Sequence, residues 1–206
     1  MDSELLKALK KIQALASTGL FYTNDVYNKE RFEEIDTISK QLLASMAGVS
    51  SQRIDGLVSD LAKGYATPRI DVRGALLRKD RILLVKELDG YWTLPGGFAD
   101  VGLSGRENIE KEIVEEANLH TEAISVYSIR HKAKHDYDPD VRDFYKLFYL
   151  CEQTEPGEPK AGMETVDVGF FALDGLPPLS TARVLEEDIV AAFEYQKSTI
   201  RPALFD

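Results

Sequence analysis

Hydrophobic positions near the start of the chain recur at the spacing of an α-helix. The first predicted helix follows a cap signal at Ser3 and carries Leu5, Leu6, Leu9, Ile12 and Leu15. The second spans residues 28–46, and one of its faces carries Phe32, Ile35, Ile38, Leu42 and Leu43. The third follows Ser50 and Ser51 and carries Ile54, Leu57, Val58 and Leu61. Three short helices bury little apolar surface by themselves, so we expect a small helical domain, residues 1–64, with a linker at residues 64–68.

After Pro68 the pattern changes to short apolar runs bounded by turn residues. Strands are predicted at residues 70–77, 82–86, 125–130, 144–151 and 168–172, with a turn at Lys79 and Asp80. Helices are predicted at residues 104–117 and 182–196, and the Trp-Thr-Leu-Pro-Gly-Gly segment at 92–97 predicts a rigid turn. Strands on both sides of a central helix predict a mixed α/β domain, residues 65–206.

Composition and charge narrow the class of protein. The formal net charge of -10 disfavours nucleic acid and anionic membranes as partners, because these are bound mainly through Lys and Arg. The single cysteine, Cys151, allows no disulfide within the chain, so we expect a cytoplasmic protein. There is no run of about 18 apolar residues, so no membrane-spanning segment is expected.

Three glutamates on the predicted central helix carry the strongest chemical signal. Glu112, Glu115 and Glu116 stand at positions i, i+3 and i+4, which lie on one helix face. On an arbitrary acidic helix such residues form a solvated charged face. Here Gly96 and Gly97 lie upstream, where backbone without a Cβ can approach a ligand or a metal ion. The pattern therefore predicts a site of oxygen ligands for Mg²⁺ or Mn²⁺.

Residues 97–119 resemble the Nudix box, Gly-x5-Glu-x7-Arg-Glu-U-x-Glu-Glu-x-Gly-U, in which U is a bulky aliphatic residue. The matching positions are Gly97, Glu112, Ile113, Glu115, Glu116 and Leu119. Leu103 replaces the first Glu and Lys111 replaces the Arg, two residues that form a structural ion pair in the family. Lys111 therefore lacks that partner, while the metal-binding carboxylates remain. Asn118 replaces the last Gly, a mild change because Asn is the usual second choice for a left-handed residue at a helix end.

The flanks of the box resemble one bacterial branch of Nudix hydrolases, which carries a helical N-terminal domain. The similar segments are residues 92–102, Asp71-Val72-Arg73, Lys134-His135, Tyr145-Lys146 with Cys151, and residues 168–171. The resemblance implies a Nudix α/β/α sandwich with a mixed sheet, preceded by the helical domain. It also implies hydrolysis of the diphosphate bond in a nucleoside diphosphate linked to another group, such as CDP-choline or ADP-ribose. A homodimer is implied as well, in agreement with the long apolar face predicted for the second helix.

The acidic residues receive separate roles under this resemblance. Glu112 and Glu116 are the first choice of metal ligands, next to the backbone at Gly96. Glu115 is expected to bind a further ion or to prepare the attacking water. Glu164 lies in a predicted loop before a strand, where it is either an acid near the metal ions or an ordinary loop charge.

Three basic residues are candidate substrate contacts, and two of them, Arg73 and His135, have a plain structural alternative. Arg73 sits in an apolar strand, where it either contacts phosphate or snorkels from the edge of the sheet. Lys134 and His135 lie in the polar stretch 131–143, which predicts a long loop facing the substrate. His135 either hydrogen-bonds phosphate or is an exposed loop residue.

Two other functions remain open from the sequence. One is a Nudix-fold sensor that binds a nucleotide and regulates a partner without hydrolysis, against which the retained Glu112, Glu115 and Glu116 argue. The other is removal of free nucleoside triphosphates, such as oxidised ones, which the N-terminal helical domain disfavours.

Overall fold

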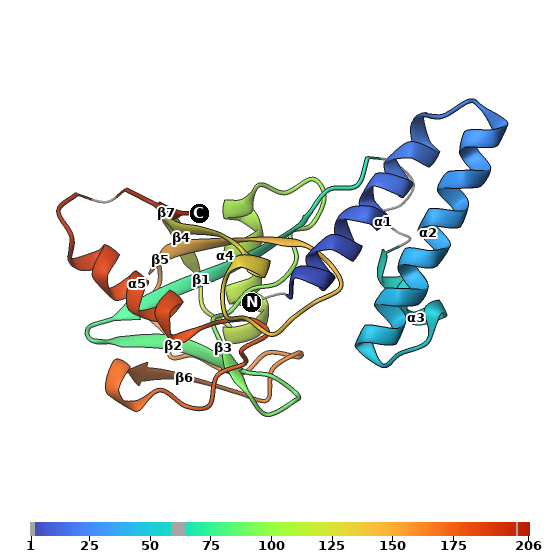
Figure 1. The fold of residues 1–206 in the computed structure, drawn as a ribbon. Helices are drawn as coiled ribbons and strands as arrows, with labels where there is room; N and C mark the ends of the chain where they lie inside the picture. Colours follow the sequence, from blue (N-terminus) through green and yellow to red (C-terminus); the bar gives the residue numbers. More distant parts are fainter. Residues whose placement is uncertain (1–2, 59–64, 201) are drawn as a thin grey trace. The chain divides into compact units, whose positions relative to one another are not determined.

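The computed structural model describes residues 3–58, 65–200 and 202–206 (Figure 1). The chain divides into two compact units, Met1–Arg69 with Asp138–Phe144 and Ile70–Tyr137 with Tyr145–Asp206. The segment Asp138–Phe144 thus belongs with the N-terminal helices, although it lies far along the chain. Leu61 and the expected domain end at residue 64 lie outside the described residues, so the division into 1–64 and 65–206 stays a prediction.

The predicted N-terminal helices are present, and their boundaries follow from their caps. They are α1 (Glu4–Tyr22), α2 (Val26–Ala47) and α3 (Ser51–Val58). The Ser3 side chain accepts a hydrogen bond from the Leu6 amide at the start of α1. Asp25 accepts one from the Asn28 amide, so α2 begins two residues before the predicted start. Gly48, in the left-handed region with φ 63°, ends α2.

The apolar residues of α1 and α2 divide between an inner and an outer face. The inner face forms a small core of Leu6, Leu9, Leu43, Ala44 and Ile54, against which Val141 packs. The outer residues are exposed: Leu5, Ile12 and Leu15 on α1, with Ile35, Ile38 and Leu42 on α2. The single apolar face predicted for α2 is therefore wrong, since Leu43 lies about 100° around the helix from Leu42. The segment Asp138–Phe144 is held on this unit by an ion pair of 2.8 Å between Lys10 and Asp143.

The second unit is built around one mixed sheet. Its strands are β1 (Arg69–Arg78), β2 (Arg81–Lys86), β3 (Trp92–Thr93), β4 (Thr121–His131), β5 (Phe144–Gln153), β6 (Asp167–Ala172) and β7 (Leu204–Phe205). Their order is β3-β2-β1-β5-β4-β7, with β6 paired to β2. The pairs β1–β2 and β4–β5 are antiparallel, whereas β4–β7 is parallel. The predicted mixed sheet is thus confirmed.

Helices cover both faces of this sheet (Figure 1). On β2, Leu83 and Val85 pack on the side of α4 (Gly105–Ala117), whereas Ile82 and Leu84 pack on the side of α5 (Glu186–Lys197). A strand that is buried on both faces has a continuous apolar run, which is the pattern of residues 82–85. The α/β/α sandwich is confirmed.

Local predictions differ from the structure at three places. Trp92 and Thr93 form the short strand β3, where a turn was expected. Helix α5 begins four residues later than predicted, because the amides of Arg183 and Val184 are used in turn bonds to the Ser180 carbonyl. Strand β7 was not predicted, since two residues are too few to show an alternating pattern.

Candidate active site

Helix α4 is fixed at both ends. The Ser104 side chain accepts from the Glu107 amide, and the Glu107 carboxylate accepts in turn from the Ser104 amide. At the other end Asn118 is left-handed, with φ 54°, as its place in the motif predicts. Ile109 and Ile113 are fully buried under the sheet, so the rotation of the helix about its axis is also determined.

Two glutamates of α4 meet the double-glycine turn. The Gly96 amide donates a 2.8 Å hydrogen bond to Oε2 of Glu116, which is buried. Gly96 has φ 137°, and a Cβ there would lie 2.0 Å from the Val72 carbonyl oxygen, so only glycine fits. A Cβ at Gly97 would lie 2.9 Å from Oε1 of Glu112. The two glycines therefore bring the backbone of the turn against both carboxylates.

The electrostatics of this pair favour a cation. Burial raises the pKa of Glu116 to about 8, although the Arg73 charge and the Gly96 hydrogen bond oppose the shift. Burial also raises the pKa of Glu112, and the negative charges of Glu115 and Glu164 add to the effect. A bound divalent ion would offset both the burial and the mutual repulsion of these carboxylates. It would take the place of water as their partner, and its positive charge would neutralise their negative charges.

The donor atoms fit an oxygen-seeking ion with an incomplete protein shell. In the described part of the chain, no three His, Cys, Asp or Glu side chains are arranged to hold a metal ion by themselves. Mg²⁺ typically binds through one or two carboxylates and keeps water and phosphate oxygens as its other ligands. Glu112 and Glu116 beside the Gly96 turn match that requirement.

Glu115 is more exposed than Glu112 and Glu116. Its side chain is exposed, and its carboxylate lies 3.2 Å from the Lys111 ammonium. The same ammonium lies 3.1 Å from the Asp100 carboxylate. Lys111 therefore lacks the partner that a glutamate at Leu103 would provide, and Asp100 supplies the negative charge instead.

Glu164 lies on a loop that is hydrogen-bonded to the C-terminal end of α4. The Gly162 amide and the Thr165 hydroxyl both donate to the Glu116 carbonyl at the C-terminal end of α4. These bonds satisfy a backbone carbonyl that the end of the helix leaves without a partner. The Glu164 side chain is exposed, and its charge acts on the pKa of Glu112. Glu164 therefore lies near enough to Glu112 to influence it, and a catalytic role for Glu164 stays a prediction.

Arg73 is buried on β1, so the interpretation as a snorkelling edge residue is wrong. Its Nε and Nη2 donate to the two oxygens of Asp71 at 2.8 and 3.0 Å, and its Nη1 donates to the Leu94 carbonyl at 3.1 Å. Burial alone would raise the pKa of Asp71, but Arg73 and Lys146 outweigh it and lower that pKa to about 2. A direct contact of Arg73 with substrate stays a prediction.

The depressed pKa of Asp71 predicts a specific loss of stability in acid. A carboxyl group with a lowered pKa stabilises the fold above its ordinary value of 3.8, and this contribution disappears as the pH falls towards 2. We expect about 2 kcal/mol of the free energy of unfolding to depend on pH in this window. Urea unfolding followed by circular dichroism between pH 2 and 5 measures it. Asp71→Asn should flatten the dependence, and identical slopes in both proteins would contradict the assignment.

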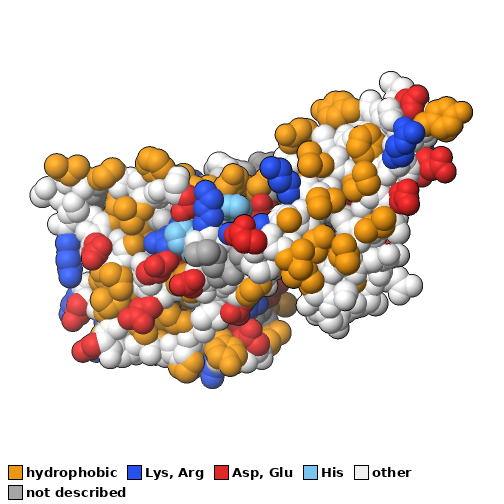
Figure 2. All heavy atoms as spheres, viewed as in Figure 1, with side chains coloured by type: hydrophobic (Ala, Val, Ile, Leu, Met, Phe, Trp, Pro, Cys, Tyr) orange, Lys and Arg blue, Asp and Glu red, His pale blue; other side chains and the backbone are white. Residues whose placement is uncertain are grey.

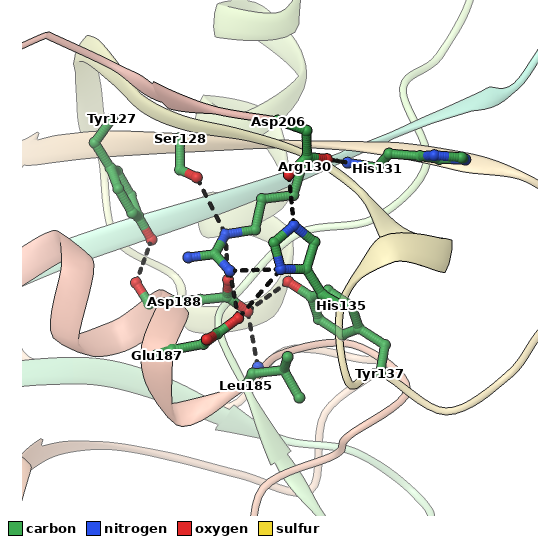
Figure 3. A network of polar contacts seen from close by, with 10 residues as sticks. All are labelled: Tyr127, Ser128, Arg130, His131, His135, Tyr137, Leu185, Glu187, Asp188 and Asp206. Atoms are coloured by element: carbon green, nitrogen blue, oxygen red, sulfur yellow. Dashed lines mark hydrogen bonds and ion pairs between the residues drawn. The ribbon is translucent and has the colours of Figure 1, made fainter. Parts of the chain in front are cut away.

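Lys134 and His135 lie in the connection between β4 and β5, which is the predicted long loop and contains one short 3-10 helix. Figure 3 shows His135 among the polar side chains of this region. Residues Lys132–Lys134 form a short 3-10 helix, and Lys134 is exposed. The His135 ring lies 2.6 Å from the Asp206 carboxylate and 3.0 Å from the Arg130 guanidinium. Among the residues that the structure describes, neither Lys134 nor His135 pairs with the acids on α4. Their contact with substrate stays a prediction.

Sequence reasoning assigned no role to two charged residues that act on this site. Lys146 is buried on β5 and donates to Asp71. Glu87 follows β2, pairs with Arg183 at 3.3 Å and contributes to the raised pKa of Glu116. For Lys146 a signal exists, because a lysine within an apolar strand needs a buried partner. For Glu87 no signal exists, because its proximity to Glu116 depends on the fold.

Comparison with known families decides the classification. The NUDIX domain profile matches residues 67–193, which is more than half of the chain. The chain belongs to the Nudix family. A second profile, described as a UDP-X-like N-terminal oligomerisation domain, matches residues 3–58 of this Nudix protein.

Relatives support the same classification over the full length. YjhB of Bacillus subtilis (strain 168), whose name assigns it provisionally as an ADP-ribose pyrophosphatase, is 38% identical over 210 residues, covering 100% of this chain and 99% of YjhB. The crystal structure of an ADP-ribose pyrophosphatase from Streptococcus suis 89-1591 is 41% identical with a TM-score of 0.62, covering 68% of this chain and 100% of that one. The crystal structure of a UDP-X diphosphatase is 29% identical with a TM-score of 0.62, covering 98% and 97%. This Nudix protein is therefore an enzyme, a pyrophosphohydrolase that cleaves phosphoanhydride bonds.

Proposed function

We propose that this Nudix enzyme is a metal-dependent hydrolase of a nucleoside diphosphate linked to another group, of the ADP-ribose or CDP-choline class. The products would be a nucleoside monophosphate and a phosphorylated second product. The observation that carries the proposal is the placement of buried Glu116 and half-buried Glu112 beside the Gly96 turn. Mg²⁺ is the proposed ion, and Mn²⁺ is the expected substitute because it accepts the same oxygen ligands.

The residues of the site have different proposed roles in the reaction. A bound divalent ion neutralises diphosphate charge and polarises the phosphorus that water attacks. Glu112 and Glu116 supply its protein oxygens, and the Gly96 amide fixes the orientation of Glu116. Glu164 is the proposed acceptor of the proton from the attacking water, because its carboxylate is exposed and forms no ion pair with a lysine of the described residues. Glu115, which Lys111 engages in this structure, is the alternative acceptor or a ligand of a further ion.

The proposed substrate class is tested by a hydrolysis panel. Purified enzyme with Mg²⁺ is offered ADP-ribose, CDP-choline, UDP-sugars and nucleoside triphosphates, and the products are separated by chromatography. We expect kcat/KM for one of the linked diphosphates to exceed that for every triphosphate by at least about tenfold, a difference of about 1.4 kcal/mol in transition-state binding. A preference for triphosphates would contradict the proposal and favour removal of free nucleotides.

We also propose that the enzyme is a homodimer formed through its N-terminal helices. The outer residues of α1 and α2 form an exposed apolar surface (Figure 2), which soluble monomers seldom leave open. The match of residues 3–58 to an oligomerisation domain supports this assembly. A two-fold axis would place the same surface of a second copy against it.

Light scattering at micromolar concentration should report about twice the chain mass of 23.1 kDa. Ile38→Asp places a charge in the outer apolar face of α2, so it should shift the protein to a monomer. Thr37→Asp is the matched control, because residue 37 is exposed on the same helix but points about 100° away from Ile38. A wild-type monomer, or equal dissociation by both variants, would contradict the proposed interface.

We propose that nucleic acid is not a partner of this enzyme. The net charge of -10 argues against nucleic acid. None of the helices within the described ranges could cross a membrane. A cytoplasmic location rests only on the single buried cysteine, Cys151, which forms no disulfide within the chain.

A further inference from the structure

Lys146 is a fully buried lysine in the middle of the sheet. Its side chain is 1% exposed, and its ammonium donates a 2.8 Å hydrogen bond to Oδ1 of Asp71 on the neighbouring strand. The rings of Tyr137 and Phe148 lie 5.4 and 5.9 Å from that ammonium. A lysine in this position cannot reach solvent and makes its ion pair inside the protein.

Asp71 serves two cations at once. Its Oδ1 accepts from Lys146 and also from Nε of Arg73 at 2.8 Å, while its Oδ2 accepts from Nη2 of Arg73. One negative and two positive groups are thus buried together. Burying charges costs several kcal/mol per ion, and apolar residues often stabilise a fold equally well. Stability is therefore a weak reason for this cluster.

The cluster leads directly to the metal-binding turn. The remaining guanidinium nitrogen of Arg73, Nη1, donates a hydrogen bond to the carbonyl of Leu94, two residues before Gly96. The Gly96 amide holds the Glu116 carboxylate, and the Arg73 charge acts on that carboxylate as well. The backbone of β1 holds the same turn, with amides donating to the carbonyls of residues 95 and 97. A continuous series of contacts thus joins Lys146 to Glu116.

We propose that Lys146 is a positioning residue for the metal ligand Glu116, acting through Asp71 and Arg73. Lys146 holds the Asp71 carboxylate from the β5 side, so that Asp71 accepts from both Nε and Nη2 of Arg73. Arg73 in turn fixes the turn whose Gly96 amide orients Glu116. The inference rests on the proposed metal-dependent function and deepens it, because it assigns a residue on another strand to the metal site.

The test measures metal binding on the full-length enzyme without substrate. Mn²⁺ is titrated, and the free ion is followed by electron paramagnetic resonance. Lys146→Met should weaken Mn²⁺ binding by about tenfold, the usual effect of removing a partner that supports a ligand. Its thermal unfolding without metal should be unchanged or shifted upward, because Asp71 keeps its charge pair with Arg73, although no longer held in position from β5, and one buried charge is removed. If Lys146 only stabilised the fold, its replacement would lower the melting temperature and leave Mn²⁺ binding unchanged.

A double-mutant cycle shows whether the effect passes through Arg73. Lys146→Met added to Arg73→Met should cause no further loss of Mn²⁺ affinity, since the series of contacts is already broken. Arg78→Met is the matched control for Arg73→Met. Arg78 lies on β1, as Arg73 does, but its guanidinium donates to Glu158 and to the Gly157 carbonyl. Arg78→Met should leave Mn²⁺ binding unchanged within about twofold.

The outcomes separate this inference from the proposed function. If Glu116→Gln leaves Mn²⁺ binding unchanged, the metal site itself is wrong. If Glu116→Gln weakens binding but Lys146→Met does not, or if the Lys146 and Arg73 losses add, the positioning role is overturned. Lys146→Gln serves as a second variant should Lys146→Met fail to fold. Loss of the folded state in both would assign Lys146 to stability alone.

Discussion

Replacement of Glu116 by Gln is expected to lower turnover by at least about a hundredfold. Glutamine keeps the shape of the side chain and an oxygen that can accept from the Gly96 amide, so the turn should stay in place. What is lost is the negative charge that binds the divalent ion. Steady-state kinetics on the preferred substrate at saturating Mg²⁺ measures the effect, with circular dichroism to establish that the fold survives.

Glu110→Gln is the matched control for this variant. Glu110 lies on the same helix, but its carboxylate accepts from Arg106 and from the Ala123 amide, away from the metal-binding face. The amide can retain one of these bonds, so turnover should stay within about twofold of wild type. A Glu116→Gln enzyme with near-normal rate and normal metal binding would show that the site lies elsewhere.

Removal of divalent ions is expected to reduce hydrolysis to below about 1% of its normal rate. The reason is that the ion supplies the positive charge that offsets the diphosphate, which its proposed ligands, buried Glu116 and half-buried Glu112, cannot supply themselves. Activity is measured in excess EDTA and again after Mg²⁺ is added in excess over the chelator. The second measurement should restore the rate, which separates metal removal from irreversible damage.

A binding measurement makes the metal prediction independent of substrate choice. An ion that binds only the folded chain, and not the unfolded one, stabilises the fold. The gain is about 2.7 kcal/mol at an ion concentration one hundred times Kd. The melting temperature should therefore fall in EDTA for the wild type and change much less for Glu116→Gln. Full activity in excess EDTA, with an unchanged melting temperature, would exclude a metal-dependent mechanism.

Much of the active-site element is readable from the sequence because its signals are local. The spacing of Glu112 and Glu116 places them on one face of a helix, and that face is the one beside the double-glycine turn. The start of α4 at Ser104 and its end at Asn118 follow from capping chemistry within a few residues. The apolar run at residues 82–86 likewise predicts a strand, and the structure buries residues 82–85 of it on both faces.

The helical region shows where periodicity stops being informative. A repeat of apolar residues predicts a helix, but it does not say which residues meet the core and which are left exposed. On α2, Leu43 is buried, whereas Ile38 and Leu42 are exposed, and the difference depends on where α1 and α3 lie. The assignment of the segment Asp138–Phe144 to this unit also depends on contacts distant in sequence.

What the sequence determined by itself is the identity of the elements and the presence of a carboxylate helix behind a double glycine, because these follow from backbone geometry over a few residues. Only the tertiary structure decided which carboxylate is buried, that Asp100 pairs with Lys111, and that Lys146 meets Asp71 across two strands. Residues 71 and 146 become neighbours only when β1 and β5 pair, and no local pattern encodes that pairing. Burial and charge pairing depend on everything that surrounds a side chain, so they emerge only once the whole domain has packed.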